Sequence, residues 1–256
     1  MPAFSAISFD FAGSLARITL SNPPLNVITL PMMEELGDAL AQVEQRPEIS
    51  VILVHGAGGN FSAGVDVAAH MPEQAPEMLA KFHAIIRALI SSRKVTVASV
   101  QGSCLGGGAE LAMVCDLVLT TGDAVWGFPE IKLGCYPPVA CTALAALVGQ
   151  KRATELILTG RKINGAEAAA IGLATRAVPE DKLWAAVEET TRRLSELSPA
   201  TLALTKKATY AWDSMHFDKG LARAERIYLE ELIKTEDASE GIASFLEKRT
   251  PNWKGR

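Results

Sequence analysis

Hydrophobic and polar residues alternate at the start of the chain and then adopt a helical spacing. The segments ISFDF and LARITL alternate on either side of the turn AGS, which predicts a β-hairpin. A helix is expected from Pro31 to about Gln45, with Thr29 or Leu30 near its start, because proline fits the first turn of a helix.

Short apolar runs and helical stripes then follow one another through the middle of the chain. SVILVH (50–55) and VTVASV (95–100) predict buried strands, and apolar residues recur at helical spacing between 76 and 93. A further helix is expected at AELAMVC, and further short strands at DLVLTT and AVWGF. Strand, loop and helix units that recur in this way predict an α/β fold.

From residue 150 onward the pattern is almost wholly helical. Apolar stripes of helical period run through 150–158, 165–171, 180–197, 200–213 and 218–247. No low-complexity segment or obvious linker separates these stripes from the first part of the chain. We therefore expect the helices to dock on the α/β core or on another subunit.

Composition and charge limit the classes of partner. Hydrophobic residues make up 48% of the chain and charged residues 21%, which is typical of a globular protein. The net charge of −4 gives no general attraction to nucleic acid or to an anionic membrane, so neither is expected as a partner. We find no signal-peptide pattern and no apolar run long enough to span a bilayer. The four cysteines lack CxxC spacing, which predicts reduced thiols and a cytoplasmic location.

A glycine-rich segment, VTVASVQGSCLGGGAE, joins a predicted strand to a predicted helix. A helix start offers unpaired N–H groups and the positive end of the helix dipole, and glycines let a ligand approach the backbone closely. Three interpretations stay open: a phosphate site, a site for a developing enolate oxygen, and tight packing of a strand against a helix. The phosphate-binding patterns GxxxxGKS/T and GxGxxG are both absent.

Two acidic residues stand in apolar surroundings. Glu110 lies in the first turn of a predicted helix, where an acid also complements the helix dipole. Glu130 lies in WGFPEIKLG, between aromatic residues and an apolar patch. Two such carboxyl groups can differ in pKa, so that one acts as a base and the other as an acid. The alternative is a pair of solvated surface residues.

The sequence gives little support to nucleophilic or metal chemistry. Cys104 precedes the glycines, but no histidine lies near it in the sequence. The histidines, His55, His70, His83 and His216, are scattered along the chain. We therefore expect Cys104 to be a small buried residue and expect no metal site.

Four motifs now identify a family resemblance. NFSAGVDV resembles the FxAGAD loop of the enoyl-CoA hydratase/isomerase (crotonase) family, and QGSCLGGGAELAMVCD resembles its GxxxGGGxELAxxCD segment. FPEIKLG resembles its PEIxLG segment, and FLEKRTPNW resembles its final helix. The motifs occur in the family's order, and the resemblance covers essentially the whole chain.

The resemblance implies a fold, an assembly and a substrate. The fold would be a crotonase-like spiral of ββα units, with an α/β core over 1–195 and a C-terminal helical trimerisation region over 196–256. The assembly would be a homotrimer or a dimer of trimers. The substrate would be an acyl-CoA thioester, and because coenzyme A is then part of the substrate, no separate cofactor is expected.

The resemblance also assigns roles to individual positions. Glu110 would take a proton from water, and Glu130 would deliver one to carbon. The backbone N–H groups of Val65 and Gly107 would form an oxyanion hole for the thioester oxygen. The Val65 side chain would make this hole narrower than the small residue that is usual at this position. The other positions expected to contact coenzyme A or substrate are Ala63, Asp66, Val67, Gly106, Pro129, Leu133, Tyr136, Pro138 and Lys248. Of these, Lys248 would reach the coenzyme A of its own or a neighbouring subunit.

One segment departs from the typical 2-enoyl-CoA hydratase pattern. CYPPVAC places Pro138 where those enzymes have a glycine whose amide helps to hold the attacking water. Proline has no N–H, so that contact cannot form. This segment and the C-terminal sequence look more like those of cyclohexa-1,5-diene-1-carbonyl-CoA hydratases. Tyr136, Trp126 and Phe128 could then be flat walls around a ring, although core packing explains aromatic residues equally well.

The leading hypothesis is therefore a lyase that adds water to a conjugated enoyl- or dienoyl-CoA thioester through a stabilised enolate. Two alternatives within the family are short-chain 2-enoyl-CoA hydration and double-bond isomerisation. The alternative from another class is a non-catalytic acyl-CoA-binding protein that keeps the fold.

Overall fold

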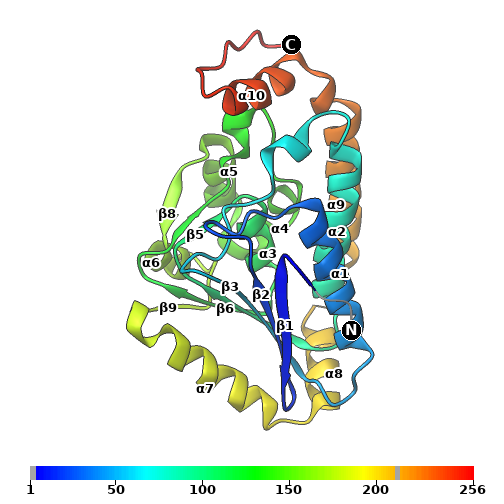
Figure 1. The fold of residues 1–256 in the computed structure, drawn as a ribbon, viewed down its shortest axis with the longest axis vertical. Helices are drawn as coiled ribbons and strands as arrows, with labels where there is room; N and C mark the ends of the chain where they lie inside the picture. Colours follow the sequence, from blue (N-terminus) through cyan, green and yellow to red (C-terminus); the bar gives the residue numbers. More distant parts are fainter. Residues whose placement is uncertain (1–3, 211–213) are drawn as a thin grey trace.

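The computed structural model describes residues 4–210 and 214–256, and it is built around a six-stranded sheet in the order β1-β2-β3-β4-β6-β9 (Figure 1). The strands are β1 (Ile7–Ala12), β2 (Leu15–Leu20), β3 (Val51–Gly56), β4 (Val95–Val100), β6 (Leu117–Thr121) and β9 (Arg176–Val178). β1 and β2 form the predicted antiparallel hairpin, and every other neighbouring pair is parallel. The predicted α/β class is confirmed.

A second, smaller sheet lies beside the site described below. It consists of β5 (Ser103–Leu105), β7 (Val125–Gly127) and β8 (Lys162–Asn164), in the order β5-β7-β8. β5 lies in the glycine-rich segment that was predicted to join a strand to a helix, and β8 and β9 interrupt the part expected to be almost wholly helical. Each of these strands has three residues, which is too short for an alternating pattern to show.

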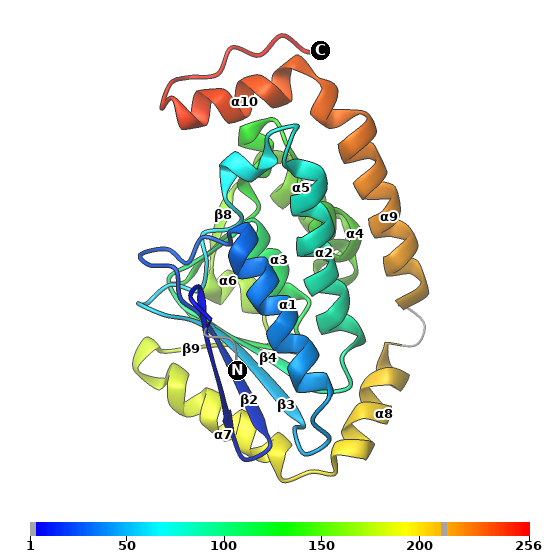
Figure 2. The same cartoon turned by 45° about the vertical axis from the view of Figure 1, so that its right-hand side comes forward.

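The helices cover both faces of the main sheet (Figure 2). They are α1 (Leu30–Glu44), α2 (Ala75–Ser91), α3 (Gly107–Met113), α4 (Pro138–Val148), α5 (Gln150–Thr159), α6 (Gly165–Ala170), α7 (Leu183–Ser195), α8 (Pro199–Thr209), α9 (Ser214–Glu230) and α10 (Glu236–Leu246). Short 3₁₀ helices occur at η1 (Val67–His70), η2 (Pro129–Leu133), η3 (Glu180–Lys182) and η4 (Leu232–Lys234).

Three helical segments differ from the sequence prediction. The pattern predicts no element over 138–148, but α4 begins there, because Pro138 fits a first helical turn that needs no N–H donor. The stripe over 218–247 is two helices, since Thr235 accepts a hydrogen bond from the Ala238 N–H and so starts α10. The helix expected over 200–213 ends at Thr209, and residues 211–213 lie outside the described residues.

The two faces of the sheet have separate cores because successive side chains of a strand point in opposite directions. Ile52 and Val54 of β3 belong to the main core, together with the buried residues of α1 and α2. Val51 and Leu53 of the same strand belong to a smaller core that includes Leu183 of α7. Figure 2 accordingly shows α7 on the opposite side of the sheet from α1 and α2.

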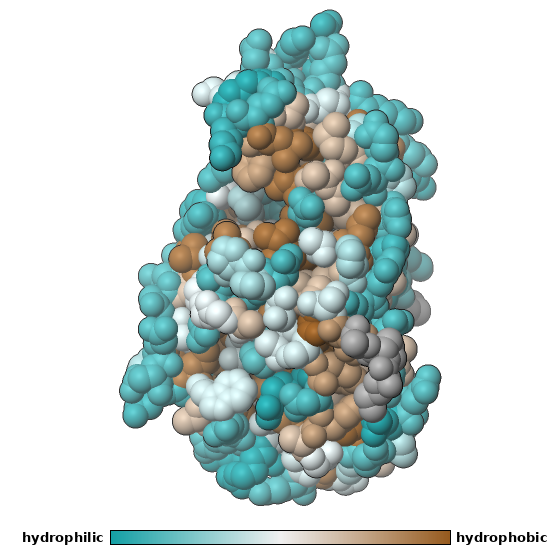
Figure 3. Space-filling model, in the orientation of Figure 1, coloured by the Kyte–Doolittle hydropathy of each residue, from teal (hydrophilic) through white to brown (hydrophobic). Residues whose placement is uncertain are grey.

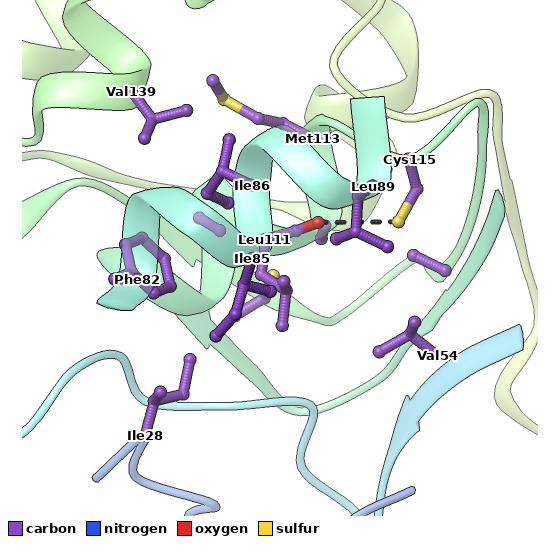
Figure 4. Close-up of a cluster of buried hydrophobic side chains, with 14 of the residues drawn as sticks. Ile28, Val54, Phe82, Ile85, Ile86, Leu89, Leu111, Met113, Cys115 and Val139 are labelled. Carbon is purple, nitrogen blue, oxygen red and sulfur yellow. Dashed lines mark hydrogen bonds between the residues drawn. The ribbon is translucent and has the colours of Figure 1, made fainter. Parts of the chain in front are cut away.

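The main core continues between α2, α3 and α4. Phe82 and Ile86 of α2, Leu111 of α3 and Val139 of α4 are buried and lie close together (Figure 4). Every residue of α3 is buried, so the helix is held on all sides. This packing fixes the position of its first turn, which carries Glu110.

A buried ion pair ties α8 to the segment just before β6, inside the main sheet. The Lys206 ammonium lies 2.8 Å from Asp116 Oδ2, and the two side chains are 7% and 12% exposed. The same carboxylate accepts hydrogen bonds from the backbone N–H and the hydroxyl of Thr96. The Lys206 ammonium also donates to Leu89 O and Lys94 O, so Asp116 is its charged partner among three acceptors.

We expect Asp116→Ala to lower the free energy of unfolding by about 3–5 kcal/mol, because it leaves the Lys206 charge buried without its partner. Urea denaturation followed by circular dichroism measures the change. Asp181→Ala is the matched control, because its ion pair with Lys182 is exposed and should contribute at most ~1 kcal/mol. Equal losses in the two variants would contradict this account of the buried pair.

Candidate active site

A cavity of about 430 Å³ lies where α2, α3, η2 and the C-terminal helices meet. Most of the sequence-predicted site residues line it, namely Ala63, Val65, Val67, Gly106, Gly107, Glu110, Pro129, Glu130, Leu133, Tyr136 and Pro138. These residues come from segments far apart in the chain, so the fold brings them together. On the surface, Figure 3 shows hydrophobic residues gathered just below the mainly hydrophilic region of α10.

Glu110 lies in the first turn of α3 and is 3% exposed. Its Oε1 accepts a hydrogen bond of 2.9 Å from the backbone N–H of Ala140. That N–H belongs to the first turn of α4, where N–H groups have no partner within the helix. The segment that contains Pro138 thus supplies the group that orients Glu110.

Glu130 lies in η2 and is 8% exposed. Its Oε2 is buried and has no hydrogen-bond partner in the described part of the chain. Gly106, with a φ of 51°, passes so close that a Cβ there would lie 2.6 Å from Glu130 Oε1. The backbone of Gly106 therefore forms the wall against which this carboxyl group rests.

The two carboxyl groups influence each other. Burial raises the pKa of Glu110, and the hydrogen bonds from Ala140 and Val139 partly oppose that rise. Burial also raises the pKa of Glu130, and the negative charge of Glu110 raises it further. Because both pKa values are raised, one carboxyl group of the pair can hold a proton near neutral pH. The other group is then a carboxylate that can accept a second proton.

Two backbone N–H groups point into the same region. Gly64 O accepts a hydrogen bond from the Ile28 N–H, and the Asp66 N–H donates to Ile28 O, so the Val65 N–H faces the other way. The Gly107 N–H is the first of α3. A Cβ on Gly107 would lie 3.5 Å from Val65 N and 2.7 Å from Val65 Cγ2. Among the described residues neither N–H has an acceptor, which suits a developing anion.

Several predicted residues lie outside the cavity lining. The carboxylate of Asp66 accepts a hydrogen bond from the Ala68 N–H and so begins η1. Lys248 follows α10 and is exposed. Trp126 and Phe128 are fully buried in the main core, so the interpretation of these two as ring walls is wrong. The Trp126 indole N–H donates to the Thr120 hydroxyl, which satisfies its polar group within the core.

The sequence analysis missed a second set of lining residues. His70 and His83, described above as scattered, both face the cavity, as does Tyr228 of α9. The C-terminal segment adds Gly241, Ser244, Phe245, Arg249 and Pro251. His83 could have been found, because it lies within the apolar stripe of α2, where a polar residue is unusual.

The described residues hold neither a candidate metal cluster nor a helix that could cross a membrane. The described residues contain no cluster of three or more His, Cys, Asp or Glu side chains placed to hold a metal ion. No helix in the described ranges is long and apolar enough to cross a membrane.

Comparisons with known proteins point to one family. The model of the family described as enoyl-CoA hydratase/isomerase matches residues 10–256. A cyclohexa-1,5-dienecarbonyl-CoA hydratase of Thauera aromatica is 36% identical over 244 residues, which is 95% of this chain and 94% of the relative. A probable enoyl-CoA hydratase of Mycobacterium bovis is also 36% identical, over 93% of this chain and 94% of the relative.

The three-dimensional comparison gives the same result. The crystal structure of an enoyl-CoA hydratase from Mycobacterium avium subsp. paratuberculosis superposes with a TM-score of 0.90 at 30% identity, covering 98% of this chain and all of the other. Fold and site thus define an α/β protein of crotonase-like architecture. The chain belongs to the enoyl-CoA hydratase/isomerase family.

Proposed function

We propose that this chain is a hydro-lyase that adds water to a conjugated enoyl- or dienoyl-CoA thioester. The observation that carries the proposal is the placement of two buried, mutually interacting carboxyl groups beside two free backbone N–H groups in one cavity. Family membership supports this type of reaction. An apolar cavity with a few converging polar groups also suits a small acyl group.

In this proposal the thioester oxygen accepts hydrogen bonds from the Val65 and Gly107 N–H groups. Glu110 removes a proton from water as the water oxygen bonds to the electron-poor carbon. The electron pair of the double bond moves toward the thioester, whose oxygen becomes an enolate held by the two N–H groups. The enolate then collapses, and Glu130 donates its proton to carbon.

Hydration is tested with crotonyl-CoA and cyclohexa-1,5-diene-1-carbonyl-CoA in ¹⁸O-labelled water. We expect labelled oxygen in the product of at least one thioester. Products that carry a shifted double bond and no label would instead support isomerisation. Thioester binding without turnover of either compound would support a non-catalytic acyl-CoA-binding protein.

We further propose a cyclic dienoyl-CoA as the substrate. The Tyr136 hydroxyl donates to Ala224 O at 2.7 Å, so the side chain can present its apolar ring to the cavity rather than its hydroxyl. Pro138 begins α4 on the same cavity wall and offers no N–H to a water molecule. The Thauera relative is named for such a substrate, but the equally similar mycobacterial relative is named only as an enoyl-CoA hydratase.

The substrate proposal predicts a clear preference in turnover. We expect kcat/KM for the cyclic dienoyl-CoA to exceed that for crotonyl-CoA, because a ring fills the space beside Tyr136 and Pro138. Initial rates measured with both thioesters decide the question. Equal or faster turnover of crotonyl-CoA would contradict the cyclic substrate and favour short-chain 2-enoyl-CoA hydration.

The remaining parts of the proposal concern assembly and location. We propose an α/β core over 1–195 and a C-terminal trimerisation region over 196–256, which assembles the chain as a homotrimer or dimer of trimers. In that assembly Lys248, exposed after α10, would contact the coenzyme A moiety of its own or a neighbouring subunit. Coenzyme A would enter as part of the substrate, with no further cofactor. The free cysteines support a cytoplasmic location.

A further inference from the structure

Two buried polar atoms in the cavity are not used by the proposed reaction. His83 Nε2 is buried and has no hydrogen-bond partner within the described residues, and the buried Tyr228 hydroxyl has only the weak Cys135 thiol beside it. Both side chains line the same cavity as Glu110 and Glu130. Buried polar atoms normally have partners, so these two mark a place where a ligand can supply them.

The surroundings of His83 determine which of its ring nitrogens carries the proton. His83 is fully buried, and its Nδ1 lies 2.7 Å from Glu225 Oε1 on α9. The Arg87 guanidinium donates to the same carboxylate oxygen at 2.8 Å. An oxygen that accepts from a guanidinium also accepts from the imidazole, so Nδ1 carries the proton.

The charge state of His83 follows from the same environment. Burial lowers the pKa of His83, although the hydrogen bond to Glu225 partly opposes this. The ring is therefore neutral near pH 7, and its Nε2 is a bare acceptor on a side chain that lines the cavity. A group that donates a hydrogen bond is needed to satisfy it.

His83 is held by a different contact from the reacting carboxyl groups. It lies on α2 and contacts Glu225 of α9, whereas Glu110 lies on α3 and Glu130 on η2. A water molecule that reacts between the two glutamates is committed to them, so we assign Nε2 a partner on the acyl group.

The chemistry of the two free atoms selects the partner. A hydroxyl group both donates and accepts, so it suits a bare nitrogen acceptor on one side and a tyrosine hydroxyl on the other. An ammonium group would need a negative charge, but the charge of Glu225 is already engaged by Arg87 and His83. The fully buried position of His83 points to the acyl group rather than to the large polar coenzyme.

We propose that His83 determines substrate specificity by accepting a hydrogen bond from a hydroxyl group on the acyl moiety of the thioester. Glu225 and Arg87 act as positioning residues, because they hold the imidazole in the tautomer that leaves Nε2 free. Tyr228, one helical turn from Glu225 on α9, supplies a second polar contact on the same wall. The proposal rests on the acyl-CoA site proposed above and adds a substrate class to it.

The test uses saturated thioesters, which bind but cannot be hydrated. Cyclohexanecarbonyl-CoA is compared with its 2-, 3- and 4-hydroxy derivatives by isothermal titration calorimetry. We expect at least one hydroxy derivative to bind about 10-fold more tightly than the parent, as a hydrogen bond to a buried acceptor predicts. Equal affinity for the parent and all three derivatives would overturn the proposal.

Two variants distinguish the role of the free Nε2 from that of the contact between Nδ1 and Glu225. The amide of His83→Asn reaches the position of Nδ1 and keeps a donor for Glu225, but it removes the acceptor at Nε2. The amide of His83→Gln places an oxygen acceptor near the position of Nε2. We expect the preference for the hydroxy derivative to disappear in the first variant and to persist at least in part in the second. A preference that survives unchanged in His83→Asn would overturn the proposal.

The same titrations separate this inference from the proposed function. If all the thioesters bind with equal affinity, the acyl-CoA site stands and the role of His83 is lost. If no thioester binds to the folded wild-type protein, the acyl-CoA site itself is wrong, and the proposal for His83 fails with it.

Discussion

Replacing either buried glutamate by glutamine should reduce kcat by ~100-fold or more, because an amide can neither accept nor donate the transferred proton. The expected loss is large since each carboxyl group serves a different half of the proposed reaction. Glu110→Gln keeps an oxygen that can accept the Ala140 hydrogen bond, so the fold around α3 should persist. Steady-state rates with the preferred thioester measure the effect.

Binding provides the control for this experiment. The dissociation constant for butyryl-CoA, a saturated thioester, should change by no more than about threefold, because the oxyanion hole is made by backbone groups. Glu188→Gln, on the exposed side of α7, should retain full activity. Near-normal turnover in both active-site variants would assign the proton transfers to other groups.

Gly106→Ala should also reduce kcat by ~100-fold, although it adds only one methyl group. The new Cβ would lie 2.6 Å from Glu130 Oε1, a distance at which the carboxyl group must move. A displacement of about 1 Å at a catalytic group is enough for a loss of this size. The variant should remain folded, with activity lost mainly in kcat.

Gly13→Ala is the control for a methyl group added at a positive φ. Gly13 has a φ of 60° in the β1–β2 turn, close to the 51° of Gly106, but nothing lies within 4 Å of an added Cβ. It should cost about 1–2 kcal/mol of stability and leave kcat unchanged. If Gly106→Ala lost no more activity than Gly13→Ala, the contact with Glu130 would have no catalytic importance.

The sequence predicted the elements in which a periodic hydrophobic pattern extends over many residues. The hairpin, the strands β3 and β4 and the helices α1 and α2 all lie close to their expected positions. The three-residue strands β5, β8 and β9 were missed, because their pairing partners lie up to tens of residues away and no local period reveals them. The start of α4 was missed because two consecutive prolines look like an irregular segment.

The candidate site was predictable where motif residues lie close together, and less so where the fold joins distant segments. Glu110 and Glu130 line one cavity, as their shared apolar surroundings suggested. Trp126 was misplaced because burial and a role in the cavity produce the same sequence pattern. The contact between His83 and Glu225 joins residues 142 positions apart, which no spacing within either helix indicates.

The lining residues of the cavity are translated over a long stretch of the chain, which affects folding on the ribosome. Glu110 and Glu130 leave the ribosome before the C-terminal lining residues, which extend to Pro251. A growing chain emerges from its N-terminus and folds as it appears. The apolar lining around the two carboxyl groups therefore stays incomplete until residue 251 has emerged, and a nascent chain that stalls earlier exposes apolar surface that the folded protein buries.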